Sequence, residues 1–307
     1  LRVGAKGLTP DERKTLSVDD EAGGGNTVVP MQFARGLIKF VDDMVYIRQY
    51  ATVETITGSE SLGVVTMDAD YGDADWTVEL GTGSEDTAKL FGRRELKPHP
   101  LAKRVKVSNT LIRRSTQPVD RLVQQRLGYR ISVTQEKAYL TGDGAQKPLG
   151  LFTPSNLGIP TSRDVVTASP TAFTGDELID CKFNLKAQYQ NARNTRWIFS
   201  RETLKRIRKL KSGTDYIWAP GLAGTPATGL DTPYLMSEFA PSTFTAGQYV
   251  ALIGDLSFYG IVDALDMQIQ VLLELYAENN QRGYIVRYEG DGMPLLPEAF
   301  SRLILAP

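Results

Sequence analysis

The chain has 307 residues, of which 41% are hydrophobic and 23% are charged, and its formal net charge is −1. These values are ordinary for a folded protein, and the near-neutral charge excludes a polycation made for binding nucleic acid. The single cysteine, Cys181, excludes an intrachain disulfide and fits maturation in a reducing compartment. The sequence shows neither an apolar run long enough to span a membrane nor a signal-peptide pattern.

The N-terminal region predicts an arm followed by a helix. Residues 1–27 are polar and include Gly23–Gly25, which favours an extended or flexible segment. Pro30 then opens a predicted helix whose apolar residues recur at helical spacing: Phe33, Leu37, Ile38, Val41, Met44 and Val45. Leu1 stands where a methionine would be expected, which is compatible with a processed N-terminus or with the start of a shorter piece.

The segment Thr52–Leu96 is rich in glycine and predicts a long two-stranded hairpin, with Trp76–Leu80 as one strand. No lysine or arginine occurs between Gly58 and Ala88, whereas eight acids do: Glu60, Asp68, Asp70, Asp73, Asp75, Glu79, Glu85 and Asp86. Basic residues follow at once: Lys89, Arg93, Arg94, Lys97, Lys103, Arg104 and Lys106. This asymmetry indicates either a solvated loop or an electrostatic docking surface.

A long helix is predicted next, with Thr116 as its N-cap and Gly142 as its end. Its apolar stripe consists of Val119, Leu122, Val123, Leu127, Ile131 and Ala138. We expect Gly142 to close the helix in a left-handed conformation, leading into a turn that runs through Gly144.

The second half of the chain alternates helices and strands. Thr174 and Glu177 form a capping box that predicts a helix start. Later elements are predicted as follows: a strand at Arg196–Phe199, a basic helix from Ser200 to Gly213, a mobile loop at Pro220–Pro233, a strand at Met267–Leu275, a hairpin turn at Glu278–Gly283, a return strand at Tyr284–Tyr288, a further turn at Gly290–Gly292 and a final strand at Phe300–Leu305. The resulting fold class is α+β.

Signals for an enzyme are weak. The only histidine, His99, lies between two prolines that favour an extended connector. Cys181 lies on the apolar stripe of its helix and is expected to be a buried, inert thiol. Because nucleophile-elbow, phosphate-loop and calcium-loop patterns are also missing, we expect no enzymatic activity, catalytic residue, cofactor or metal. A carboxylate-dependent hydrolase with an acidic loop site remains an alternative of another class.

Several motifs follow one another in a characteristic order. They are Glu136–Phe152, Trp197–Thr203, Leu210–Trp218, Gly254–Tyr259, Arg287–Gly292 and Glu298–Phe300, preceded by the predicted arm, hairpin and strand Val105–Ser108. Over essentially the whole chain this order resembles the major capsid proteins of tailed bacteriophages, which have the Hong Kong 97 fold. Each motif is weak alone, and their order makes the resemblance specific.

The resemblance implies an architecture of four parts. These are an N-terminal arm and helix (1–50), an extended loop formed by the hairpin (51–100), a peripheral domain with a long spine helix (101–194 and 267–307) and an axial domain (195–266). In that family the extended loop lies over a neighbouring subunit, axial domains meet at fivefold and sixfold axes, and a peripheral loop meets its copies at threefold axes. The last role would fall here to Ala277–Gly283 and the axial role to Pro220–Pro233.

The resemblance also implies function and partners. The chain would be a major capsid protein that self-assembles through pentamers and hexamers into an icosahedral shell around double-stranded phage DNA. It would be found in the virion capsid, after assembly in the host cytoplasm. Further partners would be portal, scaffolding or protease and decoration proteins, with nonspecific DNA contacts at the inner wall and no membrane. An encapsulin-like bacterial compartment of the same fold is the alternative.

Candidate subunit-interface residues follow from the acidic loop, the basic segments and the peripheral turn. They are Asp68, Asp70, Asp73, Asp75, Trp76, Glu79, Arg93, Arg94, Arg206, Asn279, Asn280 and Arg282. The acidic loop is expected to meet either the region from Arg193 to Lys211 or the spine helix of a neighbour. Some family members join a loop lysine to a peripheral asparagine. Because Gly283 stands at the reacting position and Lys89 lies at the base of the loop, we expect no such crosslink here.

Overall fold

The computed structural model describes residues 46–57, 59–67, 71–77, 82, 85, 91–115, 118–212, 215–216, 228–229 and 232–307. These residues belong to one compact unit, residues 42–307. The predicted arm, the helix after Pro30, and residues Asp68, Asp70, Glu79 and Lys89 lie outside the described residues. Within the described ranges, no helix is both long and apolar enough to cross a membrane.

The described elements are a mixture of helices and strands, which confirms the α+β class. The helices are α3 (Ile47–Tyr50), α4 (Asn109–Arg114), α5 (Val119–Thr141), α6 (Gly175–Phe183), α7 (Ala187–Gln190) and α8 (Arg201–Arg208), with short 3-10 turns η2 (Thr161–Arg163), η3 (Leu256–Phe258), η4 (Ala277–Asn279) and η5 (Pro297–Ala299). The strands are β1 (Thr52–Thr55), β2 (Leu62–Met67), β3 (Phe91–Leu96), β4 (His99–Ser108), β5 (Asp164–Val166), β6 (Thr195–Phe199), β7 (Lys211–Ser212), β8 (Asp215–Tyr216), β9 (Thr228–Gly229), β10 (Thr232–Met236), β11 (Tyr249–Asp255), β12 (Tyr259–Leu272), β13 (Gln281–Pro294) and β14 (Phe300–Ile304).

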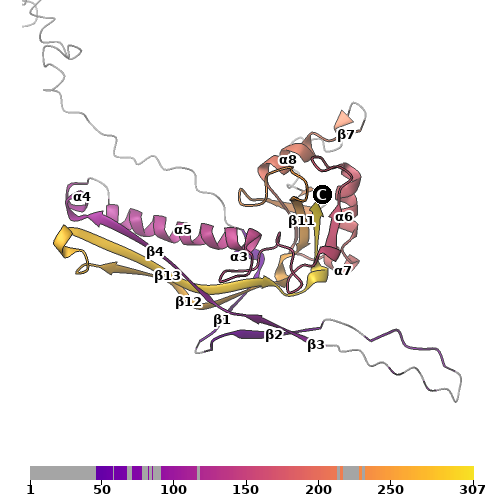
Figure 1. Ribbon diagram of the computed structural model, residues 1–307, viewed down its shortest axis with the longest axis horizontal. Helices are drawn as coiled ribbons and strands as arrows, with labels where there is room; N and C mark the ends of the chain where they lie inside the picture. Colours follow the sequence, from indigo (N-terminus) through magenta and orange to yellow (C-terminus); the bar gives the residue numbers. More distant parts are fainter. Residues whose placement is uncertain are drawn as a thin grey trace, which may run out of the picture. The chain divides into compact units, whose positions relative to one another are not determined.

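A four-stranded sheet in the order β1-β12-β13-β4 supports the long helix. β1 is parallel to β12, whereas the other neighbours are antiparallel. Helix α5 lies along β4 and β13 (Figure 1). The predicted stripe residues Leu127 and Ile131 are buried there against Tyr284 and Val286 of β13. The apolar residues that alternate along β13 and those that recur every third or fourth position along α5 therefore pack in one apolar layer.

The N-terminal boundary of α5 differs from the prediction. The helix begins at Val119 with Pro118 as its N-cap, so Thr116 is not the capping residue. Pro118 has φ −71° and ψ 81°, which lies outside the helical region, so Val119 is the first helical residue. The short helix α4 was not predicted. Its N-cap is Ser108, whose side chain accepts a hydrogen bond from the Thr110 backbone N–H at 3.2 Å.

The C-terminal end of α5 is at the predicted place but has a different geometry. Gly142 caps the helix with φ −67°, so the expected left-handed conformation is wrong. Glycine is required there by close approach, because a Cβ would lie 2.1 Å from the Pro148 carbonyl oxygen. The left-handed residue is Gly144, at φ 77°. The turn therefore packs its own backbone directly against the helix end.

A six-stranded sheet in the order β5-β14-β11-β6-β10-β9 forms the second layered region. On one face, Trp197 and Ile253 contact the apolar sides of α6 and α8, including Leu178 and Ile207. On the other face, apolar residues of β6 and β11 pack with the end of α5 and the following turn: Ile198, Leu252, Tyr139, Leu140 and Leu151. Strand β11 is buried along its whole length, as its continuous apolar composition requires.

Helix and turn boundaries agree with the predictions at some positions and differ at others. The capping box of Thr174 and Glu177 is confirmed. The basic helix begins after Ser200 as predicted, but it ends at Arg208 rather than Gly213 because β7 follows and pairs with β8. The predicted turn at Gly290–Gly292 is also wrong. These residues lie inside β13, where all three pair with β12 and Gly290 also pairs with His99 of β4, which keeps the chain extended.

The glycine-rich hairpin is confirmed as the antiparallel pair β2–β3, which extends from Leu62 opposite Leu96 to Met67 opposite Phe91. Residues 71–77 have no regular secondary structure, so the predicted strand at Trp76–Leu80 is wrong at Trp76 and Thr77. One face of the ribbon, including Leu62 and Leu96, packs in a small core with β12 and β13. Most of the predicted mobile loop Pro220–Pro233 lies outside the described residues, and its end forms part of β10.

The predicted domain boundaries cut across continuous structure. Strand β12 extends over both sides of the boundary at 266/267. The six-stranded sheet joins β5 and β14, assigned to the peripheral domain, with β6 and β11, assigned to the axial domain. The boundaries therefore stay a prediction about family architecture.

Candidate functional site

The described outer part of the acidic loop, residues 71–77, lies in solvent. Residues 71–77 are all exposed, including Asp73 and Asp75. Trp76 has a relative exposure of 105%, so the largest apolar side chain of the loop is fully in solvent. Farther down the ribbon, Val65, Met67 and Phe91 are exposed on the face that is turned away from the core. A ribbon with one unsupported apolar face is a candidate contact surface.

The predicted basic interface residues differ in how strongly their own chain holds them. Arg93 is exposed on β3. Arg94 donates a hydrogen bond to the Pro294 carbonyl oxygen at 3.3 Å. Arg206 donates to the Thr171 carbonyl oxygen at 2.7 Å, and its guanidinium lies 3.5 Å from the centroid of the Phe244 ring. The structure therefore gives Arg94 and Arg206 intrachain roles, and Arg93 is the more accessible group.

The turn between β12 and β13 forms a second exposed surface. Asn279 is exposed, whereas Asn280, at φ 51°, is tied to Asn109 through backbone and side-chain hydrogen bonds. Arg282 forms an ion pair with Asp120 at 3.3 Å. Large apolar side chains nearby are exposed by 38–63%: Val271, Leu273 and Leu275. These three residues and Asn279 are called the tip surface below.

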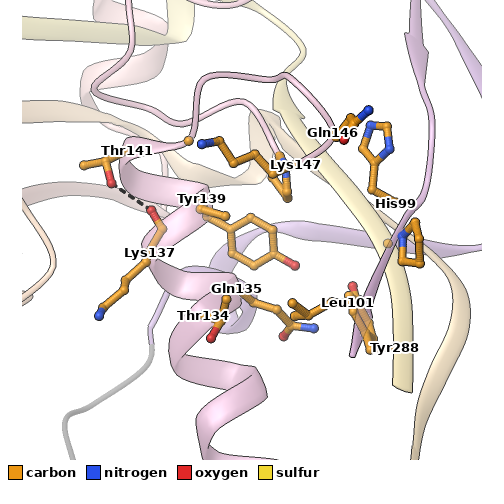
Figure 2. Close-up of a pocket in the computed structure, with 15 residues that line it drawn as sticks. His99, Leu101, Thr134, Gln135, Lys137, Tyr139, Thr141, Gln146, Lys147 and Tyr288 are labelled. Carbon is orange, nitrogen blue, oxygen red and sulfur yellow. Dashed lines mark hydrogen bonds between the residues drawn. The ribbon is translucent and has the colours of Figure 1, made fainter. Parts of the chain in front are cut away.

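A cavity of about 370 Å³ lies between α5, β4, β13 and the turn that follows Gly142. Figure 2 shows the ring of Tyr139 on the helix side, Leu101 and Tyr288 on the strand side, and Gln146 beside His99. Lys147 reaches along the turn and forms an exposed ion pair with Asp143 at 3.1 Å. The described residues that line the cavity include two lysines and a histidine but no aspartate or glutamate.

The chemistry of this cavity does not resemble a catalytic centre. Its lining contains no serine or cysteine. The hydroxyl groups of Thr134 and Thr141 donate hydrogen bonds to carbonyl oxygens of their own helix at 2.8 and 3.0 Å, so neither is held by a general base. Burial raises the pKa of Tyr139, which keeps its hydroxyl protonated near neutral pH.

Cys181 and His99, for which no chemical role was expected, lie on the buried side of a helix and at the start of a strand. Cys181 is fully buried, and burial raises the pKa of its thiol to about 12. His99 lies at the start of β4, in the extended conformation that its flanking prolines predicted. Among the described residues, no group of three or more histidine, cysteine, aspartate or glutamate side chains is arranged to hold a metal ion.

Buried charges were not predicted from the sequence. The Glu136 carboxylate, on α5, accepts hydrogen bonds from the backbone N–H groups of Tyr46 and Ile47 at 3.1 Å. Burial raises its pKa to about 7. Arg302 on β14 pairs with Asp164 on β5 at 2.6 Å, with both side chains almost fully buried. An arginine within the largely apolar strand Phe300–Ile304 could have indicated from the sequence that a buried charge pair exists.

A third buried carboxylate joins the beginning of the described chain to the four-stranded sheet. Asp263 on β12 accepts hydrogen bonds from the Arg48 guanidinium and the Tyr288 hydroxyl. Its side chain is only 2% exposed, while Arg48 is 36% exposed. Together with Glu136, this contact fixes α3 against the spine helix and the sheet.

Comparison with solved structures shows which proteins share the fold. The chain superposes on the "Capsid of native GTA particle computed with C5 symmetry" with a TM-score of 0.82 and 23% identity, covering 95% of this chain and 99% of that one. Mycobacterium phage Adephagia gives a TM-score of 0.68 with 13% identity, covering 94% and 99%. Gordonia phage Cozz gives 0.66 with 14% identity, covering 93% and 94%. These likenesses confirm the predicted Hong Kong 97-type capsid fold.

Sequence comparison assigns the family. No curated protein sequence matched the chain. The sequence model described as "Phage capsid family" matches residues 25–303, which is nearly the whole length. The resemblance predicted from the order of motifs is therefore confirmed: the chain belongs to the phage capsid family.

Proposed function

We propose that this protein is a major capsid protein whose copies assemble into an icosahedral shell that encloses double-stranded DNA. Family membership supports the structural role, and the observation that carries self-assembly is the exposed apolar surface of an otherwise well-packed chain. The β2–β3 ribbon buries one face on its own core and exposes Val65, Met67 and Phe91 on the other. An exposed apolar face of this kind is stabilised when it lies on another subunit.

The tip surface supports a second contact between copies. Leu273 and Leu275 are 59% and 63% exposed just beyond the end of β12, next to the turn Ala277–Gly283 that was predicted to meet its copies at threefold axes. Each contact is small, but closed symmetry repeats it around the whole assembly. Pentamers and hexamers are the expected intermediates. Neither the family match nor the capsid structures named above favour the encapsulin-like alternative.

The experiment is negative-stain microscopy beside size-exclusion chromatography of the expressed protein. Closed shells, or pentamers and hexamers, are expected. The double variant Leu273→Asp with Leu275→Asp should shift the protein towards free subunits, whereas Leu157→Asp, at a leucine that is 66% exposed elsewhere, should assemble normally. A chain that stays monomeric even with its partner proteins restored would refute the proposal.

DNA contact at the inner wall, and portal, scaffolding or protease and decoration proteins as partners, belong to the same proposal. Because the chain has a net charge of −1, any DNA contact should be nonspecific and weakened by salt. Assembly in the host cytoplasm fits the single, unpaired Cys181. Particles from infected cells should protect double-stranded DNA from nuclease.

We also propose that the shell carries no lysine–asparagine crosslink. The position opposite the expected lysine is Gly283, where a Cβ would lie 2.7 Å from the Tyr276 ring. An asparagine side chain would not fit there without moving that ring. Boiled particles should give a single monomer band in denaturing electrophoresis, and a ladder of higher bands would contradict this.

A further inference from the structure

Trp76 is an unusual side chain to leave in solvent. It is fully exposed, and it follows Asp73 and Asp75 in the segment Gly72–Trp76. Tryptophan contributes a large apolar area when it is buried, and it dominates contacts between proteins. The two carboxylates beside it would steer it towards a positively charged site. The segment therefore has the composition of an anchor with a charged flank.

The cavity beside α5 has the complementary composition. Its volume of about 370 Å³ lies within the range of natural ligand sites. The Tyr139 ring and Leu101 provide apolar walls, and the side-chain amides of Gln135 and Gln146 provide acceptors for an indole N–H (Figure 2). His99 lies beside Gln146 at the rim, and Lys147 lies on the adjoining turn with its amine directed away from both, where it pairs with Asp143 at 3.1 Å. No aspartate or glutamate is among the described lining residues, and an incoming Asp73 or Asp75 would share or replace Asp143 as the partner of Lys147.

Trp76 does not fill the cavity of its own subunit. Trp76 of the same chain is 105% exposed, so it is not inserted in any pocket of its own subunit. Each copy thus offers both Trp76 and this cavity, and such a head-to-tail contact closes into a ring when the rotation between copies allows it. Resting on the proposed shell function, we propose that the cavity receives Trp76 of a second copy, with Asp73 and Asp75 beside Lys147.

This contact would set which subunits become neighbours. The Trp76→Ala variant should raise the protein concentration needed for assembly by about tenfold or more, as expected for loss of a buried anchor. Phe183→Ala is the matched control because Phe183 is an aromatic residue, 68% exposed, that does not line the cavity. The control should assemble at the wild-type concentration.

Disulfide trapping tests the contact itself. Two singly substituted chains, Thr77→Cys and Gln146→Cys, are assembled together and oxidised. Thr77 adjoins the intact Trp76, and Gln146 lies at the cavity rim. Docking brings the two thiols together, so we expect roughly tenfold more heterodimer than when Phe183→Cys replaces Gln146→Cys. Cys181 is buried in every variant and does not compete.

Adding Trp76→Ala to the Thr77→Cys chain should remove the heterodimer signal. A charge exchange provides a second measurement: Lys147→Asp should weaken assembly, and Asp73→Lys with Asp75→Lys should restore it. Wild-type shells that form while the trapped heterodimer stays at the control level would overturn the docking site and leave the shell function intact. A wild-type chain that never assembles would overturn both.

Discussion

The buried carboxylate of Glu136 makes stability depend on pH in a way that one substitution should remove. Burial raises its pKa from 4.5 to about 7, although the amides of Tyr46 and Ile47 partly offset this. Below pH 4.5 the group is protonated in both folded and unfolded chains. Between pH 4.5 and about 7 the folded chain retains the proton and the unfolded chain releases it, so stability is lost as pH rises.

The size of the effect follows from the shift. A difference from 4.5 to about 7 corresponds to about 3 kcal/mol of unfolding free energy. Glu136→Gln carries no charge at any pH and can still accept one of the two amide hydrogen bonds. The unfolding free energy of the variant minus that of the wild type should therefore increase by about 3 kcal/mol across this window.

Urea unfolding of unassembled subunits, at a series of pH values spanning the window, measures this difference without the added stability of assembly. Glu202→Gln is the control, because Glu202 lies on the surface of α8 in an exposed ion pair with Lys205. Its difference from the wild type should be nearly independent of pH. Parallel stability curves for the wild type and Glu136→Gln would refute the reasoning.

Three further substitutions or reactions probe the packed regions. Asp164→Asn should lower the unfolding free energy by about 3–5 kcal/mol in urea titrations, because it leaves Arg302 charged and buried without its carboxylate. Gly142→Ala should lower the unfolding free energy by about 1–3 kcal/mol in the same assay, because its Cβ would overlap the Pro148 carbonyl oxygen. Gly128→Ala, in α5, is the control. Its Cβ would have the flexible Met267 methyl as nearest atom, at 3.4 Å, so this substitution should be neutral or stabilising. Cys181 should resist alkylation at neutral pH until the chain unfolds, since burial raises its thiol pKa to about 12; rapid labelling of the folded chain, followed by mass spectrometry, would contradict this.

Local chemistry predicted those parts of the fold that depend on neighbouring residues. The capping box at Thr174 and the end of α5 at Gly142 are encoded within a few positions, and the β2–β3 hairpin was indicated by the glycine-rich composition of its own segment. The start of α5 and the extended path through Gly290–Gly292 were missed for different reasons. The first depends on the conformation of Pro118, which lies outside the helical region. The second depends on pairing with β12, and at Gly290 also with β4, both of which are distant in sequence from this segment.

In the candidate sites too, features that depend on local composition were predicted and features that depend on long-range contacts were not. The exposure of Asp73, Asp75 and Trp76 agrees with the acidic composition of the loop. Composition could not show that Arg206 stacks on Phe244, because that contact joins residues far apart in the chain. Nor could it reveal the cavity, whose walls come from α5, two strands and a turn. Such a site exists only after long-range packing is complete.

The paired strands β12 and β13 have a mechanical consequence. Each has 14 residues, so the pair spans about 45 Å from the buried Tyr259 to the tip surface. Hydrogen bonding makes such a pair stiff along its length, except where the register shifts between Asp263 and Leu265 and again between Leu265 and Gln268. Bending strain should collect at these two irregularities. Identical chains could thereby adopt slightly different curvatures at different places in a closed surface while their cores stay rigid.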